Sequence, residues 1–278
     1  MIELRNMNFA YSKRKKIFED LSLTVEGGHI YGLLGKNGAG KTTLLKLMTG
    51  LRFPQSGSST AFGMDTKKRN IKMLQDIYFL PEEIWLPDVR VDGYLNMFAN
   101  SYPRFDHELF KRCLTEFEIN ATDKLKNMSF GQRKKVAISF ALATQCKILI
   151  MDEPTNGLDI PSKGQFRKLA AEIIGEDSCI ILSTHQVRDL ESLIDTVIIL
   201  DESRILLNNT MEEICSKLLF KTLMSLDNQP DVLYSEFTPR GYLAVTPNMN
   251  ETDSKIDLEI LFNMTTQNAN LMKQLFNH

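Results

Sequence analysis

A glycine-rich segment that ends in lysine and threonine constrains this chain more than any other feature. It lies between an apolar run, Ile30–Leu34, and a helical stretch that begins near Lys41. Its residues are Gly35, Lys36, Asn37, Gly38, Ala39, Gly40, Lys41, Thr42 and Thr43. Glycines let a backbone wrap closely around phosphates, and the helix N-terminus adds positive potential. The Lys41 ammonium can reach the β- and γ-phosphates of a nucleotide, and the Thr42 hydroxyl can bind Mg²⁺. An ordinary turn is the alternative, but chance gives this pattern in only roughly one chain in a hundred of this length.

The composition narrows the class of protein. The 278 residues are 43% hydrophobic, which is enough for a sizeable core, and the net charge of -2 gives no broad positive field, so no nucleic-acid partner is expected. No apolar run approaches the ~18–20 residues of a membrane span, and Met1–Arg5 carries no signal core. The cysteines form no C-x-x-C pair and fit reduced thiols in the cytosol. Any membrane-spanning part is therefore expected in another chain.

Apolar strands alternate with helical stretches, which predicts an α/β fold with a largely parallel sheet. Residues 84–146 lack this alternation and are expected to form helices. They therefore indicate a helical insertion between two halves of the α/β core. Beyond about residue 210 the chain is richer in Asn, Thr and Met. The expected strands are Ile2–Phe9, Leu21–Val25, Ile30–Leu34, Asp76–Leu80, Lys147–Met151, Ser178–Ser183 and Thr196–Leu200; the expected helices are Val91–Asn100, Asp106–Phe117 and Phe130–Thr144; and the last part is expected to hold a hairpin at Tyr234–Val245, a strand at Ile256–Phe262 and a final amphipathic helix.

Two carboxylates follow directly on the apolar run Ile148–Met151. Ligands of α/β sheets bind at the carboxyl ends of the strands, so Asp152 and Glu153 are expected there. Asp152 would face Mg²⁺, and Glu153 would polarise a water that attacks the γ-phosphate. An acidic turn closed by Pro154 is the structural alternative. It would be competitive if the segment stood alone, but beside the phosphate loop it is not.

Five further residues have both a structural and a functional interpretation. Ser129 and Gln132 match a capping box at the start of a helix, and this segment alone favours the plain cap, although the same helix start can bind a γ-phosphate. His185 follows a strand and could hydrogen-bond a γ-phosphate. Asp159 on its own is a turn aspartate. Tyr11, in the predicted loop before the second strand, is an ordinary surface aromatic that could also stack on adenine.

Taken together and in order, these segments resemble the ABC nucleotide-binding domain over about residues 1–210. The matching residues are Gly35–Thr43 for the Walker A motif, Ile148–Glu153 for Walker B with its catalytic glutamate, Met128-Ser129-Phe130-Gly131-Gln132 for the signature L-S-G-G-Q, Asn156–Asp159 for the D-loop, His185 for the switch histidine and Tyr11 for the adenine-stacking aromatic. The resemblance implies a P-loop NTPase fold with a RecA-like core, an N-terminal antiparallel β subdomain and a helical subdomain at about 84–146. Residues 211–278 would form a small C-terminal extension.

The same resemblance implies ATP as substrate and Mg²⁺ as cofactor. It assigns catalysis to Glu153 and His185, and Mg²⁺ binding to Thr42, Asp152 and Glu82. The residues that it assigns to ATP binding are Tyr11, the segment Gly35–Thr43, Ser129, Gly131, Gln132 and Asp159. The signature of one subunit completes the ATP site of the other in this family, so a head-to-tail dimer with an identical or closely related ATPase subunit is expected. The resemblance also implies a separate transmembrane permease and a peripheral position on the cytoplasmic face of the membrane.

Two residues depart from the family pattern. Phe130 replaces the first glycine of the signature, which should leave the Ser129 cap and the Gly131 approach intact. Glu82 stands where the family has its Q-loop glutamine, and an ionised carboxylate there can only accept hydrogen bonds. The short helical region, with Tyr102-Pro103-Arg104-Phe105-Asp106, most resembles compact bacterial ATPase subunits of exporters. Transport, and export in particular, is therefore the expected function.

Two other classes compete with a transport ATPase. ABC ATPases of DNA repair, chromosome structure or translation usually carry long coiled coils, zinc-binding cysteines or two cassettes, and this sequence shows none of these. A phosphotransferase would share the phosphate loop, but the signature, the D-loop and His185 argue against it. The stretch Ile84-Trp85-Leu86-Pro87 also has two interpretations. It either lines a groove for a permease helix, since aromatic residues anchor interfaces, or buries Trp85 in the helical subdomain.

Overall fold

A six-stranded sheet forms the centre of the protein. The computed structural model describes residues 1–12, 15–227, 229–250 and 252–276. The strand order is β10-β9-β3-β8-β7-β6, with β10 antiparallel to β9 and the other pairs parallel. The largely parallel α/β sheet predicted from the sequence is confirmed. The strands are β3 (Ile30–Leu34), β6 (Ile77–Leu80), β7 (Ile148–Asp152), β8 (Cys179–Thr184), β9 (Thr196–Asp201) and β10 (Arg204–Thr210).

Four of these strands, β3, β7, β8 and β9, are buried at every residue. Two hydrophobic clusters account for this, because alternate residues of each strand face opposite sides of the sheet. In β7, Leu149 and Met151 belong to one cluster, and Ile148 and Ile150 to the other. Strands covered on both faces read as continuous apolar runs, which is why the sequence shows them so clearly.

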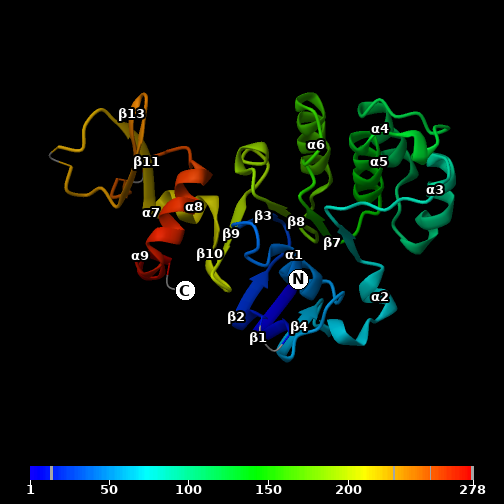
Figure 1. The fold of residues 1–278 in the computed structure, drawn as a ribbon, viewed down its shortest axis with the longest axis horizontal. Helices are drawn as coiled ribbons and strands as arrows, with labels where there is room; N and C mark the ends of the chain where they lie inside the picture. Colours follow the sequence, from blue (N-terminus) through cyan, green and yellow to red (C-terminus); the bar gives the residue numbers. More distant parts are fainter. Residues whose placement is uncertain (13–14, 228, 251, 277–278) are drawn as a thin grey trace.

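A second, antiparallel sheet lies below the central one (Figure 1). Its order is β2-β1-β4-β5, and helix α1 packs its buried leucines between the two sheets. This arrangement places the loop before α1 over the carboxyl end of β3. The elements are β1 (Ile2–Ser12), β2 (Lys15–Val25), α1 (Lys41–Met48), β4 (Ser56–Ala61) and β5 (Met64–Asp65). The strand β1 continues through Tyr11, where the sequence had indicated a loop.

Three helices on the right of Figure 1 lie between β6 and β7 in the chain: α3 (Val91–Phe98), α4 (His107–Glu116) and α5 (Phe130–Ala143). They lie within the helical insertion predicted for residues 84–146. The short helix α2 (Ile71–Leu74) precedes β6. Asp106 caps α4 by accepting from the N–H groups of Glu108 and Leu109. The buried Phe140 ring of α5 contacts the rings of Tyr94, Tyr102, Phe105 and Phe110. This aromatic core fixes α5 against its neighbours.

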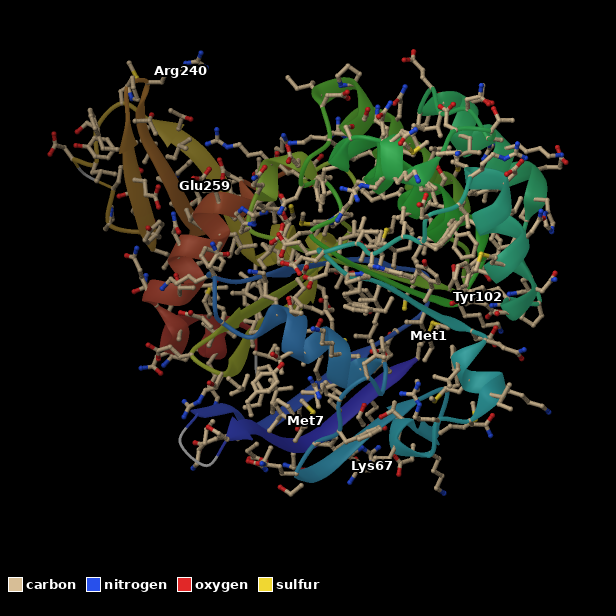
Figure 2. All side chains as sticks on the ribbon, turned by 45° about the vertical axis from the view of Figure 1, so that its right-hand side comes forward. Met1, Met7, Lys67, Tyr102, Arg240 and Glu259 are labelled. Carbon is tan, nitrogen blue, oxygen red and sulfur yellow. The ribbon has the colours of Figure 1, made fainter. Side chains whose placement is uncertain are left out.

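The remaining elements are α6 (Ile160–Ile173), α7 (Met211–Lys217), β11 (Leu218–Leu223), β12 (Tyr234–Thr238), β13 (Gly241–Pro247), α8 (Leu258–Gln267) and α9 (Ala269–Phe276). The hairpin predicted near Tyr234–Val245 is confirmed, with Arg240 at its tip (Figure 2). The strand predicted at Ile256–Phe262 is wrong, because α8 occupies this stretch. Asp257 caps α8, and its buried residues Leu258, Leu261 and Met264 recur at helical spacing. A short stretch that begins with alternating apolar and acidic residues and ends in three apolar residues does not by itself separate strand from helix.

Helix α8 packs against the 3₁₀ turn Val187–Asp189 and the strands β9 and β10. Two ion pairs cross this contact: Arg188 with Glu259, which is labelled in Figure 2, and Lys255 with Glu191. The C-terminal part therefore touches the segment that follows His185. In the part of the chain that the structure describes, no helix is long and apolar enough to cross a membrane. Cys113, Cys146 and Cys179 are buried and Cys215 is half-buried, all with free thiols.

Candidate functional site

A cavity of about 290 Å³ opens where β3 and β7 end and α1 begins. It is lined by Tyr11, Ile17, Asn37, Gly38, Gly40, Lys41, Thr42, Thr43, Glu82, Asp152 and Glu153. Most of the residues that the sequence singled out for phosphate, metal and adenine binding therefore meet at one place. The parallel strands explain this, since their carboxyl ends share one edge of the sheet.

The loop before α1 encloses a buried lysine. The Nζ atom of Lys41 donates to the carbonyl oxygens of Gly35 at 2.7 Å and Lys36 at 3.4 Å. Burial lowers the pKa of Lys41, while the carboxylates Glu153, Asp152 and Glu82 act in the opposite direction. Within this loop Gly40 has φ +105°, and an added Cβ would lie 3.0 Å from the Phe18 ring. The position therefore needs glycine for both its backbone angle and its space.

Asp152 is held by two hydroxyl groups. Thr42 Oγ1 donates to Asp152 Oδ2 at 2.6 Å, and Ser183 Oγ donates to Asp152 Oδ1. Mg²⁺ prefers oxygen ligands and usually takes only one or two protein groups together with substrate phosphates and water. A hydroxyl and a carboxylate in contact beside a phosphate loop match that donor set. The residues therefore fit a Mg²⁺ ion, with Thr42 and Asp152 as its protein ligands.

Glu153 is buried and held in an uncommon conformation. Its φ of 47° lies in the left-handed region, where a glutamate is strained. Its N–H is shared between Ser183 O at 3.2 Å and Ser183 Oγ at 3.1 Å. Its Oε1 lies 2.7 Å from His185 Nδ1, whereas its Oε2 is buried with no hydrogen-bond partner among the described residues. A buried, unsatisfied carboxylate oxygen is costly and marks a place where a substrate group or water belongs.

Tyr11 projects from the end of β1 beside the loop. Its hydroxyl lies 3.1 Å from Thr43 Oγ1, and the Arg52 guanidinium lies 5.9 Å from the centre of its ring. The side chain remains 51% exposed. A ring that is fixed at its hydroxyl end and open elsewhere is suited to stack on a planar base.

Three chain segments meet at Glu82. Asn156 Nδ2 donates to Glu82 Oε1 at 3.0 Å, and Lys134 Nζ donates to the backbone oxygen of Glu82 at 3.2 Å. Lys134 is fully buried in α5. Burial lowers the pKa of Lys134 to about 8, while Glu82, Asp152 and Glu153 act in the opposite direction. The carboxylates of Glu82, Asp152 and Glu153 therefore face two buried lysines.

The start of α5 lies outside the cavity within one chain. Ser129 and Gln132 form the predicted capping box, with both reciprocal hydrogen bonds present at 3.2 and 2.9 Å. The Phe130 ring covers Gly157, because a Cβ on Gly157 would lie 2.6 Å from Phe130 Cε1. A Cβ on Gly131 would lie 2.8 Å from Gly157 O. Close packing on the turn after β7 explains the need for glycine at 131.

Asp159 also lies outside the cavity in a single chain. It caps α6 by accepting from the Ser162 N–H at 2.9 Å, and its Oδ2 lies 3.7 Å from Lys135 Nζ. The hydrogen bonds from Ser162 lower the pKa of Asp159. Within one chain, Asp159 thus caps α6, and Ser129 and Gln132 form the capping box of α5. Any contact of these three residues with ATP remains a prediction.

Sequence reasoning did not single out three residues of the site: Ser183, Asn156 and Lys134. Ser183 is the last-but-one residue of an apolar strand, and a hydroxyl at that place was the available signal. Asn156 was seen only as part of a motif. Lys134 lies on the buried stripe of α5 with Ile138 and Ala141, at i, i+4 and i+7. A lysine on the apolar stripe of a helix is unusual, and that was the signal.

Comparison with known proteins gives consistent results. The family model described as "ABC transporter" matches residues 18–156. The chain is 30% identical over 214 residues to the ABC transporter ATP-binding protein YtrB of Bacillus subtilis, covering 76% of this chain and 72% of that protein. It is 33% identical over 226 residues to the ABC transporter ATP-binding protein NatA of the same organism, covering 77% and 91%.

Solved structures show the same fold. The structure of an ATP-binding subunit of an ABC transporter superposes with a TM-score of 0.70 at 25% identity, covering 77% of this chain and 91% of that one. A dimeric ATP-binding cassette in a post-hydrolysis state, bound to ADP and Pi, gives 0.66 at 21% identity, covering 76% and 99%. The α/β fold with an antiparallel sheet and a helical region, expected from the resemblance, is confirmed.

Proposed function

This chain belongs to the ABC transporter family as an ATP-binding, ATP-hydrolysing subunit, and we propose that it powers export through a separate membrane-spanning permease. The observation that carries the proposal is the cavity in which Lys41, Thr42, Asp152 and Glu153 converge. Among similar proteins, one is named for Nod factor export and one for methionine import. The short helical region supports export.

Binding of ATP follows from the loop and its neighbours. The Lys41 ammonium exchanges its loop carbonyl partners for the β- and γ-phosphate oxygens, because a charge-assisted bond to an anion is stronger than one to a neutral carbonyl. The loop N–H groups and the N-terminus of α1 contribute further positive potential. The adenine ring stacks on Tyr11. We assign these contacts to Tyr11 and the residues Gly35–Thr43.

Hydrolysis is assigned to Glu153 with His185. Mg²⁺, when bound, neutralises the charge that develops on the phosphate oxygens. Glu153 Oε2 accepts a hydrogen bond from the attacking water and orients it, because no group of the described residues hydrogen-bonds to this oxygen. His185 holds Oε1, so the carboxylate keeps one orientation. Glu82, which lines the same cavity, faces the same water or the metal.

The active unit is proposed to be a head-to-tail dimer of two such chains, or of this chain with a closely related one. The free N–H groups at the start of α5 and Ser129 then bind the γ-phosphate held by the partner subunit. Their position outside the cavity of their own chain supports this arrangement. ATP binding draws the two chains together, hydrolysis releases them, and the permease converts this motion into alternating access.

Phosphate release measured without any acceptor tests the enzymatic part, and Lys41→Ala should abolish it. Transport requires reconstitution with a candidate permease. ATP added on the side of this subunit should then move a substrate away from that side, and the permease should raise the rate of hydrolysis. Transport toward this subunit would reverse the proposed direction. Hydrolysis with no permease that binds the subunit would favour an ABC ATPase that is not coupled to transport.

A further inference from the structure

Lys134 is the least expected buried residue of the molecule. It lies in α5 with none of its surface exposed. Burying an ammonium group costs several kcal/mol unless the charge is paired and hydrogen-bonded. An apolar residue at this place on the stripe of α5 would avoid that cost. The groups around the Lys134 ammonium must therefore offset the cost of its burial.

The head group of Lys134 reaches the wall of the ATP cavity. Its Nζ donates to the backbone oxygen of Glu82 at 3.2 Å. The charges that favour its ammonium form are the carboxylates of Glu82, Asp152 and Glu153. These same three carboxylates line the cavity together with Lys41 and favour its ammonium form as well. Lys134 thus belongs electrostatically to the site, although its stem lies in the core of the helical region.

Glu82 is attached to the rest of the protein at two points. Its backbone is held by Lys134 of α5, and its carboxylate accepts from Asn156, which follows β7. The residues around it, from 81 to 90, form no helix or strand. Without these two contacts the loop after β6 would have few restraints close to the cavity.

We propose that Lys134 is a positioning residue for ATP hydrolysis, which fixes the Glu82 backbone so that the Glu82 carboxylate stays on the wall of the catalytic cavity. This inference rests on the proposed role of Glu82 and Glu153 in hydrolysis. Lys134 contacts neither the nucleotide nor the water, and acts through Glu82. A misplacement of about 1 Å in such a group can lower the rate by up to about a hundredfold. The pairing also joins the start of α5 to the loop after β6, so the two segments move together.

The variant Lys134→Met tests the proposal, because methionine matches the stem of lysine and removes the donor and the charge. We expect kcat to fall at least about tenfold while the KM for ATP stays within about twofold. The thermal midpoint should not fall, since an apolar side chain of similar volume is tolerated at a buried ionic position. Lys126→Met is the matched control: this exposed lysine of the helical region pairs with Asp88, and its variant should keep wild-type kcat.

A double-variant cycle separates positioning from a merely structural role. If Lys134 acts through Glu82, then adding Lys134→Met to Glu82→Ala should lower kcat less than about twofold further, because the two changes share one effect. Independent, multiplying losses would overturn the proposal. So would Lys134→Met with kcat within twofold of wild type, or Glu82→Ala with unchanged kcat beside an impaired Lys134→Met.

Should Lys134→Met fail to fold, Lys134→Leu, which also lacks the donor and the charge, replaces it under the same criteria. The ATPase activities of the wild-type protein and of Glu153→Gln distinguish a failure of the proposed function from a failure of the inference about Lys134. If the wild type releases no phosphate, the proposed function fails. If it does and Glu153→Gln does not, an active Lys134→Met refutes only the inference about Lys134.

Discussion

His185 Nδ1 lies 2.7 Å from Glu153 Oε1, and this pair joins the ends of the neighbouring strands β7 and β8. An ionised carboxylate can only accept hydrogen bonds, so Nδ1 is the donor, while His185 Nε2 lies 3.5 Å from Gln186 Nε2. The other carboxylate oxygen, Oε2, is buried and without a partner among the described residues. One oxygen therefore fixes the orientation of the carboxylate, and the other remains available for water.

Glu153→Gln should nearly abolish ATP hydrolysis and preserve ATP binding. The amide cannot accept a proton from water, and loss of a positioned base lowers rates by ~10²–10⁴-fold. Lys41 and the loop N–H groups still hold the phosphates, so trapped ATP should also favour dimers. Phosphate release and equilibrium ATP binding measure the two effects. The control is Glu83→Gln, an exposed neighbour of Glu82; steady-state hydrolysis by Glu153→Gln within a few-fold of wild type would contradict the role given to Glu153.

His185→Ala should lower kcat by ~10–10²-fold, because Glu153 loses the donor that orients it. The effect should depend on Glu153. In the Glu153→Gln background, His185→Ala should therefore cause little further loss, since residues that act as a unit are strongly non-additive. Kinetics of the two single variants and the double variant measure this coupling. Losses that multiply would mean that His185 acts independently of Glu153.

Ser129→Arg should block hydrolysis through the partner subunit, because the large cation stands where the partner's γ-phosphate docks. A mixture with Lys41→Ala chains tests this. In a mixed dimer, one site carries both changes and the other carries neither. Mixing two inactive proteins should therefore restore activity, measured as phosphate release. If mixed dimers are shown to form and no activity returns, the shared site is refuted.

Trp85→Ala should leave the isolated subunit folded and able to bind ATP, yet weaken its assembly with the permease. The structure excludes the alternative that Trp85 is core, since its side chain is 80% exposed, while Ile84 and Leu86 pack against the helical core. Aromatic anchors of interfaces often contribute about 2 kcal/mol or more, a loss of about thirtyfold in affinity. Ile71→Ala, an exposed apolar residue of α2, is the control. Unchanged affinity for the permease would reject Trp85 as an anchor.

The sequence predicted the parts of the site in which one physical requirement dominates. A loop around phosphates needs glycines at Gly38 and Gly40, where φ is positive, and strands buried on both faces read as unbroken apolar runs. The edge strand β10 was not predicted, because such a strand lacks that pattern. Helix α8 was predicted as a strand, since Ile256, Leu258 and Ile260 alternate with Asp257 and Glu259, a two-residue period that is typical of a strand.

The role of Lys134 could not be predicted because it depends on tertiary distance. Lys134 and Glu82 are 52 residues apart in the chain. A lysine on the apolar stripe of a helix is unusual, but the sequence does not say which residue it contacts. Only the packing of α5 against β6 brings them together. The same holds for Phe130 and Gly157, whose contact shows why a ring is tolerated at a signature glycine.

The attachment of α8 has a mechanical consequence. Its ion pairs, Arg188 with Glu259 and Lys255 with Glu191, are exposed and contribute only about 0–1 kcal/mol each. The buried side chains beneath them belong to the same hydrophobic cluster as β8 and β9. The contact between α8 and the central sheet is thus held mainly by buried apolar side chains and only weakly by the ion pairs at its edge. A force applied to the hairpin near Arg240 would reach the end of β8, and with it His185, through these buried side chains.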